Sequence, residues 1–187
     1  QDVDEKRKQL NLKLLELETL FDISVAISSL LDVDELGDEI LWRSVGILNA
    51  SKGMVLVSKK NSPILEVNNE FNWGELDTLI SKKLGIFKKI QENNSGAILT
   101  PNDKNTLQKK LGEDHIIITP LKAKDNILGF MILCNKETRH GIEAFNKTDL
   151  DLLSALCNQG AVALDNARLF KGITEAKQFN ESILGSI

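Results

Sequence analysis

The sequence predicts an α+β domain in which an antiparallel sheet carries helices on both faces. Apolar residues recur at helical spacing near both ends of the chain, whereas several segments between residues 53 and 135 are short, rich in β-branched residues and bounded by turn residues. The predicted order is α-α-β-β-α-α-β-α-β-β-α, and strand runs flanked by helix pairs are typical of an antiparallel sheet. We expect the first and last helices to pack together on one face and the segment 74–112 to lie over the other.

The composition is that of a globular protein. The chain has 187 residues, of which 42% are hydrophobic and 27% charged, so it fits one domain with extensions. Its net charge of -4 argues against nonspecific binding to nucleic acid, which requires positive charge to neutralise phosphates. No apolar run approaches the roughly 20 residues of a membrane helix, and residues 1–9 lack the core of a signal peptide. We therefore expect a cytoplasmic segment without direct membrane contact.

Two helices are predicted at the N-terminus. The first covers Glu5–Leu31 and carries two neighbouring apolar stripes, wide enough to face both a domain and a partner helix. The second begins at Asp32, which forms a capping-box pattern with Glu35, and runs to about Asn49. The stripes of the first helix consist of Leu10, Leu14, Leu17 and Phe21, and of Leu20, Ile23, Ile27 and Leu30.

The middle of the chain alternates between strand and helix patterns. The predicted strands are Gly53–Ser58, Ile64–Val67, Ala97–Thr100, Ile116–Lys122 and Ile127–Asn135. The predicted helices are Glu75–Leu84, Ile86–Glu92 and a short one that starts at Pro101-Asn102-Asp103 and ends near Leu111. Cys134 and Cys157 lie in apolar periodic segments, so we expect buried free thiols of a reducing compartment.

The last quarter of the chain, Phe145–Ile187, is predicted to be one long helix with a weak capping box at Asn146 and Asp149. Its second half carries a heptad seam whose steps alternate between four and three residues. With Val162 at heptad position d, both asparagines of the seam fall at a, where a buried Asn favours parallel, in-register pairing. The seam consists of Val162, Asn166, Leu169, Ile173, Ala176, Asn180, Ile183 and Ile187.

This seam predicts a homodimer through the terminal helices. The alternative is a terminal helix that packs on its own domain, and Gly160, Gly172 and Gly185 weaken the helix by up to about 1 kcal/mol each relative to alanine. Because the chain starts and stops within predicted helices, we expect it to be a module of a larger protein.

Three stretches resemble a known family. Leu150–Phe170 ends in Asn-Ala-Arg-Leu, Ile116–Lys136 has a proline after its first strand and a glycine inside its second, and Gly85-Ile86 precedes Gly96 and the Ile98-Leu99 strand. These features and the order of elements are similar to those of GAF domains, which are small-molecule sensors of signalling proteins. The resemblance covers residues 19–170. It implies a GAF-like sheet with short helices over a ligand pocket, preceded by a signalling helix (1–18) and followed by a coiled-coil linker (171–187) to an output domain.

A sharper similarity lies in Asn135, Lys136, Phe145 and Asp149. This spacing resembles the Asn-Lys-Phe-Asp-Glu motif of cyclic-nucleotide-binding GAF domains, found in phosphodiesterases and bacterial cyclases, although Leu150 stands here in place of the final Glu. The resemblance implies a structural lock in which Lys136 pairs with Asp149 and Phe145 plugs the strand-to-helix junction. A cyclic nucleotide such as cAMP or cGMP is therefore one candidate ligand, beside another small molecule or none.

The family resemblance also implies a ligand site between the sheet and the middle helices. A phosphate could bind the backbone N–H groups at Ile86 and Phe87, with Lys88 and Lys89 adding charge or forming only a solvated helix face. Asp103 could form a hydrogen bond with the base of a bound nucleotide, or it could cap a helix. The implied ligand residues are Met54, Leu56, Asn68, Asn69, Ile86, Phe87, Thr100, Asp103, Lys104, Asn105, Phe130 and Ile132.

Several classes of function are not expected. The motifs of an enzyme, a metal site or a phosphate loop are missing, and His115 and His140 lie at element ends rather than in the implied pocket. Two hypotheses remain: a sensor that binds a small molecule and signals through paired terminal helices, and a ligand-free module for dimerisation and signal relay. An open pocket with hydrogen-bond donors that point into it would favour the sensor, whereas a pocket filled by packed side chains would favour the relay module.

Overall fold

The computed structural model of the chain describes residues 2–28, 33–59, 62–66 and 85–185. The predicted helix Glu75–Leu84 and the loop before it lie outside these residues. The helices are α1 (Asp2–Ser28), α2 (Val33–Leu48), α4 (Ile86–Asn93), α5 (Thr106–Leu111) and α6 (Lys147–Gly185). The strands are β1 (Ala50–Lys59), β2 (Ser62–Glu66), β3 (Ala97–Leu99), β4 (Ile116–Ala123), β5 (Asn126–Thr138) and β6 (Gly141–Glu143).

The strands form one antiparallel sheet with the order β2-β1-β5-β4-β3, and β6 pairs with the end of β5. The central strand is β5, whose Met131 lies opposite Val55 of β1 on one side and Thr119 of β4 on the other. The predicted α+β class with an antiparallel sheet is therefore confirmed.

Both faces of this sheet are buried. Successive side chains of a strand point to opposite faces, so the run Ile116-Ile117-Ile118 supplies apolar groups to both: Ile117 packs in one core, and Ile116 and Ile118 pack in the other. A strand that is covered on both sides is apolar throughout rather than alternating, which explains the continuous apolar runs of β4 and β5.

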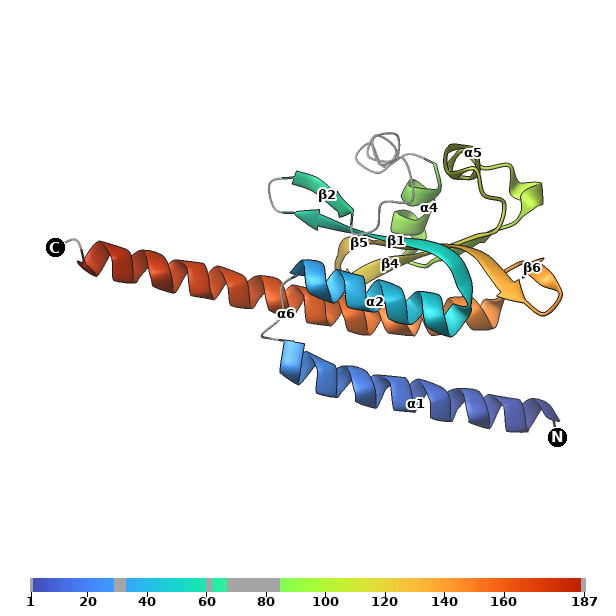
Figure 1. Cartoon of the computed structure of the whole chain (residues 1–187), viewed down its shortest axis with the longest axis horizontal. Helices are drawn as coiled ribbons and strands as arrows, with labels where there is room; N and C mark the ends of the chain where they lie inside the picture. Colours follow the sequence, from blue (N-terminus) through green and yellow to red (C-terminus); the bar gives the residue numbers. More distant parts are fainter. Residues whose placement is uncertain (1, 29–32, 60–61, 67–84, 186–187) are drawn as a thin grey trace.

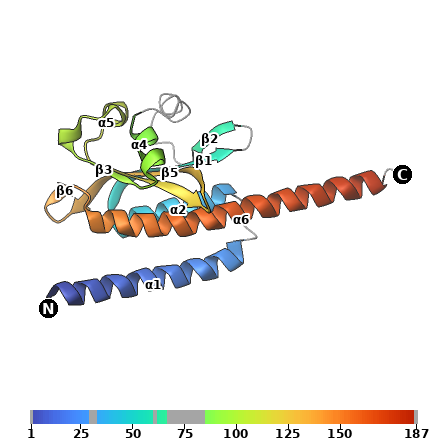
Figure 2. The ribbon, with the colours of Figure 1, turned by 180° about the vertical axis from the view of Figure 1, so that it is seen from behind.

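Different helices cover the two faces (Figure 1). On one side α2 and α6 lie directly against β1 and β4, and α1 packs on α6 from outside. On the other side lie α4 and α5, and the view from behind shows the same layers (Figure 2). The predicted packing of the first and last helices is thus confirmed, but α2 rather than α1 shares the sheet-covering layer with α6.

Close packing of α2 on α6 depends on Gly160. A Cβ added at this glycine would lie 2.7 Å from Cδ1 of Ile40. The sequence-based interpretation of Gly160 as a weak point of the helix is therefore incomplete, because the missing side chain makes room for Ile40. The α6 helix continues unbroken through Gly160 and Gly172 for 39 residues.

Several elements differ from the prediction. The β1 strand starts at Ala50, because Ala50 pairs with Lys136 at the far end of β5. The short helix predicted from Pro101 is split into a 3-10 turn, Pro101–Asp103, and α5. The β6 strand was not predicted; it folds back on β5 through a turn in which Gly141 adopts φ +101° and the Thr138 hydroxyl accepts from the His140 N–H at 3.1 Å.

Candidate functional site

The sheet face under α4 brings together six of the implied ligand residues. Four come from β1 and β5 and two from the start of α4, and each is at most 7% exposed. They belong to one apolar cluster, which also contains Ile90, Leu99 and Cys134. The six residues are Met54, Leu56, Ile86, Phe87, Phe130 and Ile132.

An aromatic pair forms the centre of this cluster. The Phe87 ring meets the Phe130 ring edge to face, with centroids 5.0 Å apart and planes at 72°. Such a pair contributes about 0.5–1.5 kcal/mol beyond its buried area. Phe87 is fully buried, so in this structure its ring fills the space between α4 and the sheet.

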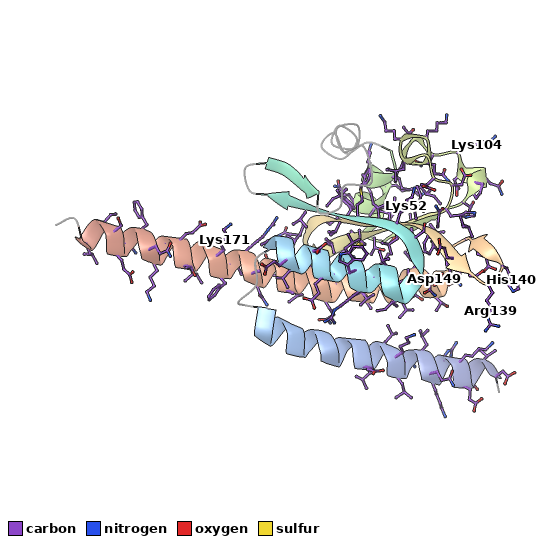
Figure 3. The ribbon with its side chains drawn as sticks, viewed as in Figure 1. Lys52, Lys104, Arg139, His140, Asp149 and Lys171 are labelled. Carbon is purple, nitrogen blue, oxygen red and sulfur yellow. The ribbon has the colours of Figure 1, made fainter. Side chains whose placement is uncertain are left out.

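The polar candidates lie outside this cluster, in the turn between β3 and α5. The Asp103 carboxylate accepts from the Thr100 N–H at 2.7 Å and from its hydroxyl at 3.1 Å, and Asn105 caps α5 by accepting from the Leu107 N–H at 3.0 Å. Thr100 is therefore the N-cap of the 3-10 turn, and Asp103 completes its capping box as the third residue instead of being the N-cap of a helix. Lys104 lies exposed at the outer rim (Figure 3), and Asn68 and Asn69 fall outside the described residues.

Gln108 is a buried polar residue that sequence reasoning missed. Its Nε2 donates to the carbonyls of Thr100 and Asp114, both at 2.7 Å, and its Oε1 accepts from the Asn105 N–H at 2.6 Å. These bonds tie the β3–α5 turn to the segment that leads into β4. The pattern Asn-x-x-Gln at 105–108 is a capping box and could have revealed this role.

Gly85 precedes the α4 helix with φ +59°. Among the described residues, no side chain caps the first turn of this helix. Lys88 and Lys89 point away from the apolar cluster, since both are exposed, and Lys88 lies 3.9 Å from Glu92. Their position is that of a solvated helix face.

The strand-to-helix junction contains the ion pair that the motif predicts. Lys136 Nζ lies 2.9 Å from Asp149 Oδ2, and the two side chains are 20% and 10% exposed. Asp149 also accepts from the Asn146 N–H, and the Asn146 side chain accepts from the Asp149 N–H, both at 2.9 Å. Phe145 is buried in the core under α6. The end of β5 is thereby tied to the start of α6, where Figure 3 places Asp149.

Asn135 makes a different contact from the rest of its motif. Its backbone adopts φ +61°, and its Nδ2 donates to Glu113 Oε2 at 2.6 Å. Glu113 Oε1 in turn accepts from Lys52 Nζ at 2.7 Å. This cluster of Lys52, Glu113 and Asn135 joins β1 to β5 and to the loop before β4, and no motif in the sequence indicated Lys52 or Glu113.

The family of the chain can be assigned once these features are combined. The antiparallel sheet, the α2–α6 layer, the short helices over the opposite face and the Lys136–Asp149 junction occur in one domain. The family model "GAF domain" matches residues 18–164. The chain belongs to the GAF family.

A curated relative and two solved structures illustrate the relationship. Diguanylate cyclase A of Treponema denticola is 24% identical over 173 residues, which cover 87% of this chain but only 46% of that protein. The GAF domain of a phosphoenolpyruvate-protein phosphotransferase from Coxiella burnetii matches with a TM-score of 0.63 at 13% identity, over 87% of this chain and 98% of that one. A GAF domain/HD domain protein from Geobacter sulfurreducens matches with a TM-score of 0.59 at 15% identity, over 76% and 97%.

The α6 helix of this GAF domain has two distinct sides. Residues that face the sheet and α2 are buried, including Ala161, Leu164 and Ala167. In the same part of the helix the seam members Val162, Asn166 and Leu169 are exposed, and from residue 171 to 185 every residue except Thr174 is exposed, the later seam members up to Ile183 included. Ile187 falls outside the described residues. No described helix is long and apolar enough to cross a membrane, and the described residues include no group of three or more His, Cys, Asp or Glu arranged to hold a metal.

The pH dependence of stability should report on Glu113. Burial raises the pKa of this carboxyl, but hydrogen bonds from Lys52 and Asn135 and the Lys52 charge outweigh burial and lower it below 4.5. A lowered pKa in the folded state means that the stabilisation is present above pH 4.5 and is lost as the pH falls through the folded pKa. Glu113→Gln should therefore lower the free energy of unfolding by about 1–2 kcal/mol at pH 7. In acid, the free energies of unfolding of the variant and of the wild type should become equal.

Urea unfolding between pH 3 and pH 7 measures this effect. Asp151→Asn is a suitable control, because Asp151 lies 3.9 Å from Lys147 and its side chain is 55% exposed. This control should follow the wild-type profile. A constant difference between wild type and Glu113→Gln at all pH values would contradict the assignment.

Replacement of Lys136 by methionine should weaken the junction between β5 and α6. Methionine keeps the aliphatic stem but leaves the buried Asp149 carboxylate without its cation, so we expect a loss of about 1–3 kcal/mol in the free energy of unfolding. The matched control is Lys147→Met, because the Lys147 side chain is 86% exposed and its Nζ lies 3.9 Å from Asp151 Oδ1. This control should change stability by less than about 0.5 kcal/mol. If the two substitutions change the melting temperature equally, the Lys136–Asp149 ion pair does not stabilise the junction.

Proposed function

We propose that this GAF domain is a regulatory module that pairs with a second copy through α6 and carries a signal to an output domain. The observation that carries this proposal is the continuity of α6. Its first half is buried against the sheet and α2, and the same unbroken helix exposes the heptad seam and extends past the domain. A displacement of the sheet would therefore move the paired tails.

The arrangement of α1 and α6 suggests how a signal would pass through the domain. Figure 1 shows α1 and α6 side by side and running the same way, with the N-terminus and the C-terminus at opposite ends of the molecule. A signal that arrives along α1 could reach α6 through their contact. A signal that arises under α4 could reach α6 through the sheet, because β4 contacts both helices.

In the sensor form of this proposal, a small molecule binds between α4 and the sheet. Phe87 occupies this space, so a ligand would displace its ring and shift α4. A ligand changes the output only as far as its affinities for the two arrangements differ. The apolar cluster around Phe87 and Phe130 fits an apolar ligand better than a cyclic nucleotide, since the polar candidates Thr100, Asp103 and Asn105 are engaged in caps.

The ligand-free relay module is the second candidate, and a specific observation favours it. The described residues on this face pack against each other, with Phe87 and nine further apolar side chains at 2% exposure or less. Packed side chains are the feature that distinguishes a closed module from an open sensor.

Thermal unfolding with added compounds separates the two candidates. A compound present at about 100 times its dissociation constant adds roughly 2.7 kcal/mol to the free energy of unfolding. The panel should contain cAMP, cGMP and small apolar compounds. If one compound raises the melting temperature and Phe130→Trp abolishes this rise, the result supports the sensor. If no compound changes the melting temperature and the protein remains a dimer, the result supports the ligand-free module.

The output domain is proposed from the curated relative. Since the chain matches 46% of a protein named diguanylate cyclase A, we propose that the full-length protein carries an output domain of that enzyme class. Incubation of the full-length protein with GTP, with cyclic di-GMP as the measured product, tests this proposal. Absence of the product under conditions in which a known cyclase is active would refute it.

Pairing through the seam makes a direct prediction for Ile173. This residue is 69% exposed in the single chain, so Ile173→Asp should leave the domain folded but place two charges at one a layer of the pair. The dimer dissociation constant should rise by about 100-fold or more, which corresponds to about 2.7 kcal/mol. Lys171→Asp, at the outermost position f, should leave the dimer intact. Sedimentation equilibrium measures the dissociation constants of both variants. An unchanged dissociation constant for Ile173→Asp would contradict pairing through the seam.

A further inference from the structure

Large apolar residues also flank the predicted seam. Phe170, Phe179 and Leu184 are 50%, 65% and 72% exposed, yet none of them occupies position a or d. In the register with Val162 at d, Phe179 falls at g, and Phe170 and Leu184 fall at e. Positions e and g of a coiled coil commonly carry Glu or Lys, which set partner choice and orientation. In this tail, Phe170, Phe179 and Leu184 place large apolar side chains at three of these positions, beside Lys177 at e and Gly172 and Ser186 at g.

The outer side of the same helix is polar. Its positions b, c and f are occupied between residues 171 and 182 by polar or charged residues, namely Lys171, Thr174, Glu175, Gln178, Glu181 and Ser182. The apolar surface is therefore limited to the seam and its two edges. This distribution fits one partner helix along the seam rather than a helix surrounded on all sides.

The two edges complement each other only in one orientation. In a parallel, in-register pair, the g residue of one helix lies against the e residue of the next heptad in the other helix. Phe179 then faces Leu184 of the second copy, and Leu184 faces its Phe179. In an antiparallel pair, g residues face g residues and e residues face e residues, so this contact does not form.

We propose that Phe179 and Leu184 form a clasp between two parallel copies of α6 and close over the Asn180 layer. Asn180 lies at position a directly beside Phe179, and its amide faces the Asn180 amide of the second copy. Exclusion of water strengthens this amide pair and raises the cost of any register that leaves one amide unpaired. The clasp thus makes the register at the end of the domain specific. This inference rests on the proposed pairing and names its partner as a second, parallel copy of the chain.

A charge exchange across the clasp tests orientation and register together. Phe179→Glu and Leu184→Lys should each raise the dimer dissociation constant by about 10-fold or more, because each removes two symmetric apolar contacts. The double variant should bind at least about 3-fold more tightly than the product of the single effects allows, since each introduced carboxylate then faces an introduced ammonium of the second copy. Gln178→Glu, at position f beside the clasp, is the control and should leave the dissociation constant unchanged.

Sedimentation equilibrium of the whole chain, with circular dichroism to verify equal helix content, distinguishes the outcomes. Recovery in the double variant supports the clasp. A double variant that binds no more tightly than additivity predicts overturns it, and this is the result expected of antiparallel helices, in which the two introduced charges do not face each other. Single variants that pair like wild type overturn the clasp while leaving the proposed pairing intact, whereas a wild-type chain that stays monomeric overturns both.

Discussion

Replacement of Gly129 by alanine should lower the free energy of unfolding by about 3 kcal/mol or more. A Cβ at this position would overlap the Leu56 carbonyl oxygen and would lie 2.8 Å from the Leu56 carbonyl carbon. Both atoms belong to the backbone of β1, so no side chain can rotate to relieve the overlap. Gly129 pairs with Val57 of β1 and Leu121 of β4, and the added methyl group must therefore separate strands at the centre of the sheet.

Urea unfolding at pH 7 measures this loss, and Gly46→Ala provides the matched control. Gly46 lies on an exposed part of α2 with nothing within 4 Å of an added Cβ. Alanine is the better helix former, so this substitution should raise the free energy of unfolding by about 0.5–1 kcal/mol. A Gly129→Ala protein with the wild-type unfolding midpoint would show that β1 and β5 do not approach as closely as described.

Truncation of Phe87 to alanine should cost about 3–5 kcal/mol. The ring is fully buried and lies edge-on to Phe130 in the cluster that joins α4 to the sheet. Its removal leaves an apolar cavity under a helix of only eight residues, which is too short to form on its own without tertiary packing. We expect α4 to lose protection from hydrogen exchange before the rest of the domain does.

The control for Phe87→Ala is Ile142→Ala on β6, whose side chain is 54% exposed and whose loss should change stability by less than about 0.5 kcal/mol. An apolar cavity of this kind stays dry and accepts small apolar molecules, so benzene should restore part of the lost melting temperature. If Phe87→Ala unfolds like Ile142→Ala, α4 does not depend on the aromatic pair.

Local patterns accounted for the elements that are buried on one or both faces. The apolar runs of β4 and β5 predicted the central hairpin, because strands covered on both faces have few polar positions. The spacing of Asn135, Lys136, Phe145 and Asp149 predicted the Lys136–Asp149 contact through resemblance to the family. The heptad seam follows from periodicity alone and remains a prediction.

The candidate site was predictable in its apolar part only. Met54, Leu56, Phe130 and Ile132 converge under α4 because strand alternation places them on one face. The polar candidates did not converge, because Asp103 and Asn105 satisfy nearby backbone N–H groups instead. Short polar side chains beside a helix start commonly bond to adjacent backbone, and a sequence offers no measure of which contact is favoured.

By itself the sequence determined the order of the main described strands and helices except β6, the burial of both sheet faces and the helical continuity of α6, because these depend on residues near one another in the chain. Only the tertiary structure decided which distant groups meet. It packs Ile40 against Gly160 and the Leu56 backbone against Gly129, and it brings the Glu113 carboxylate to Lys52 and Asn135. Each of these contacts joins different elements, and its distance is set by how the sheet and helices pack, which local periodicity does not encode.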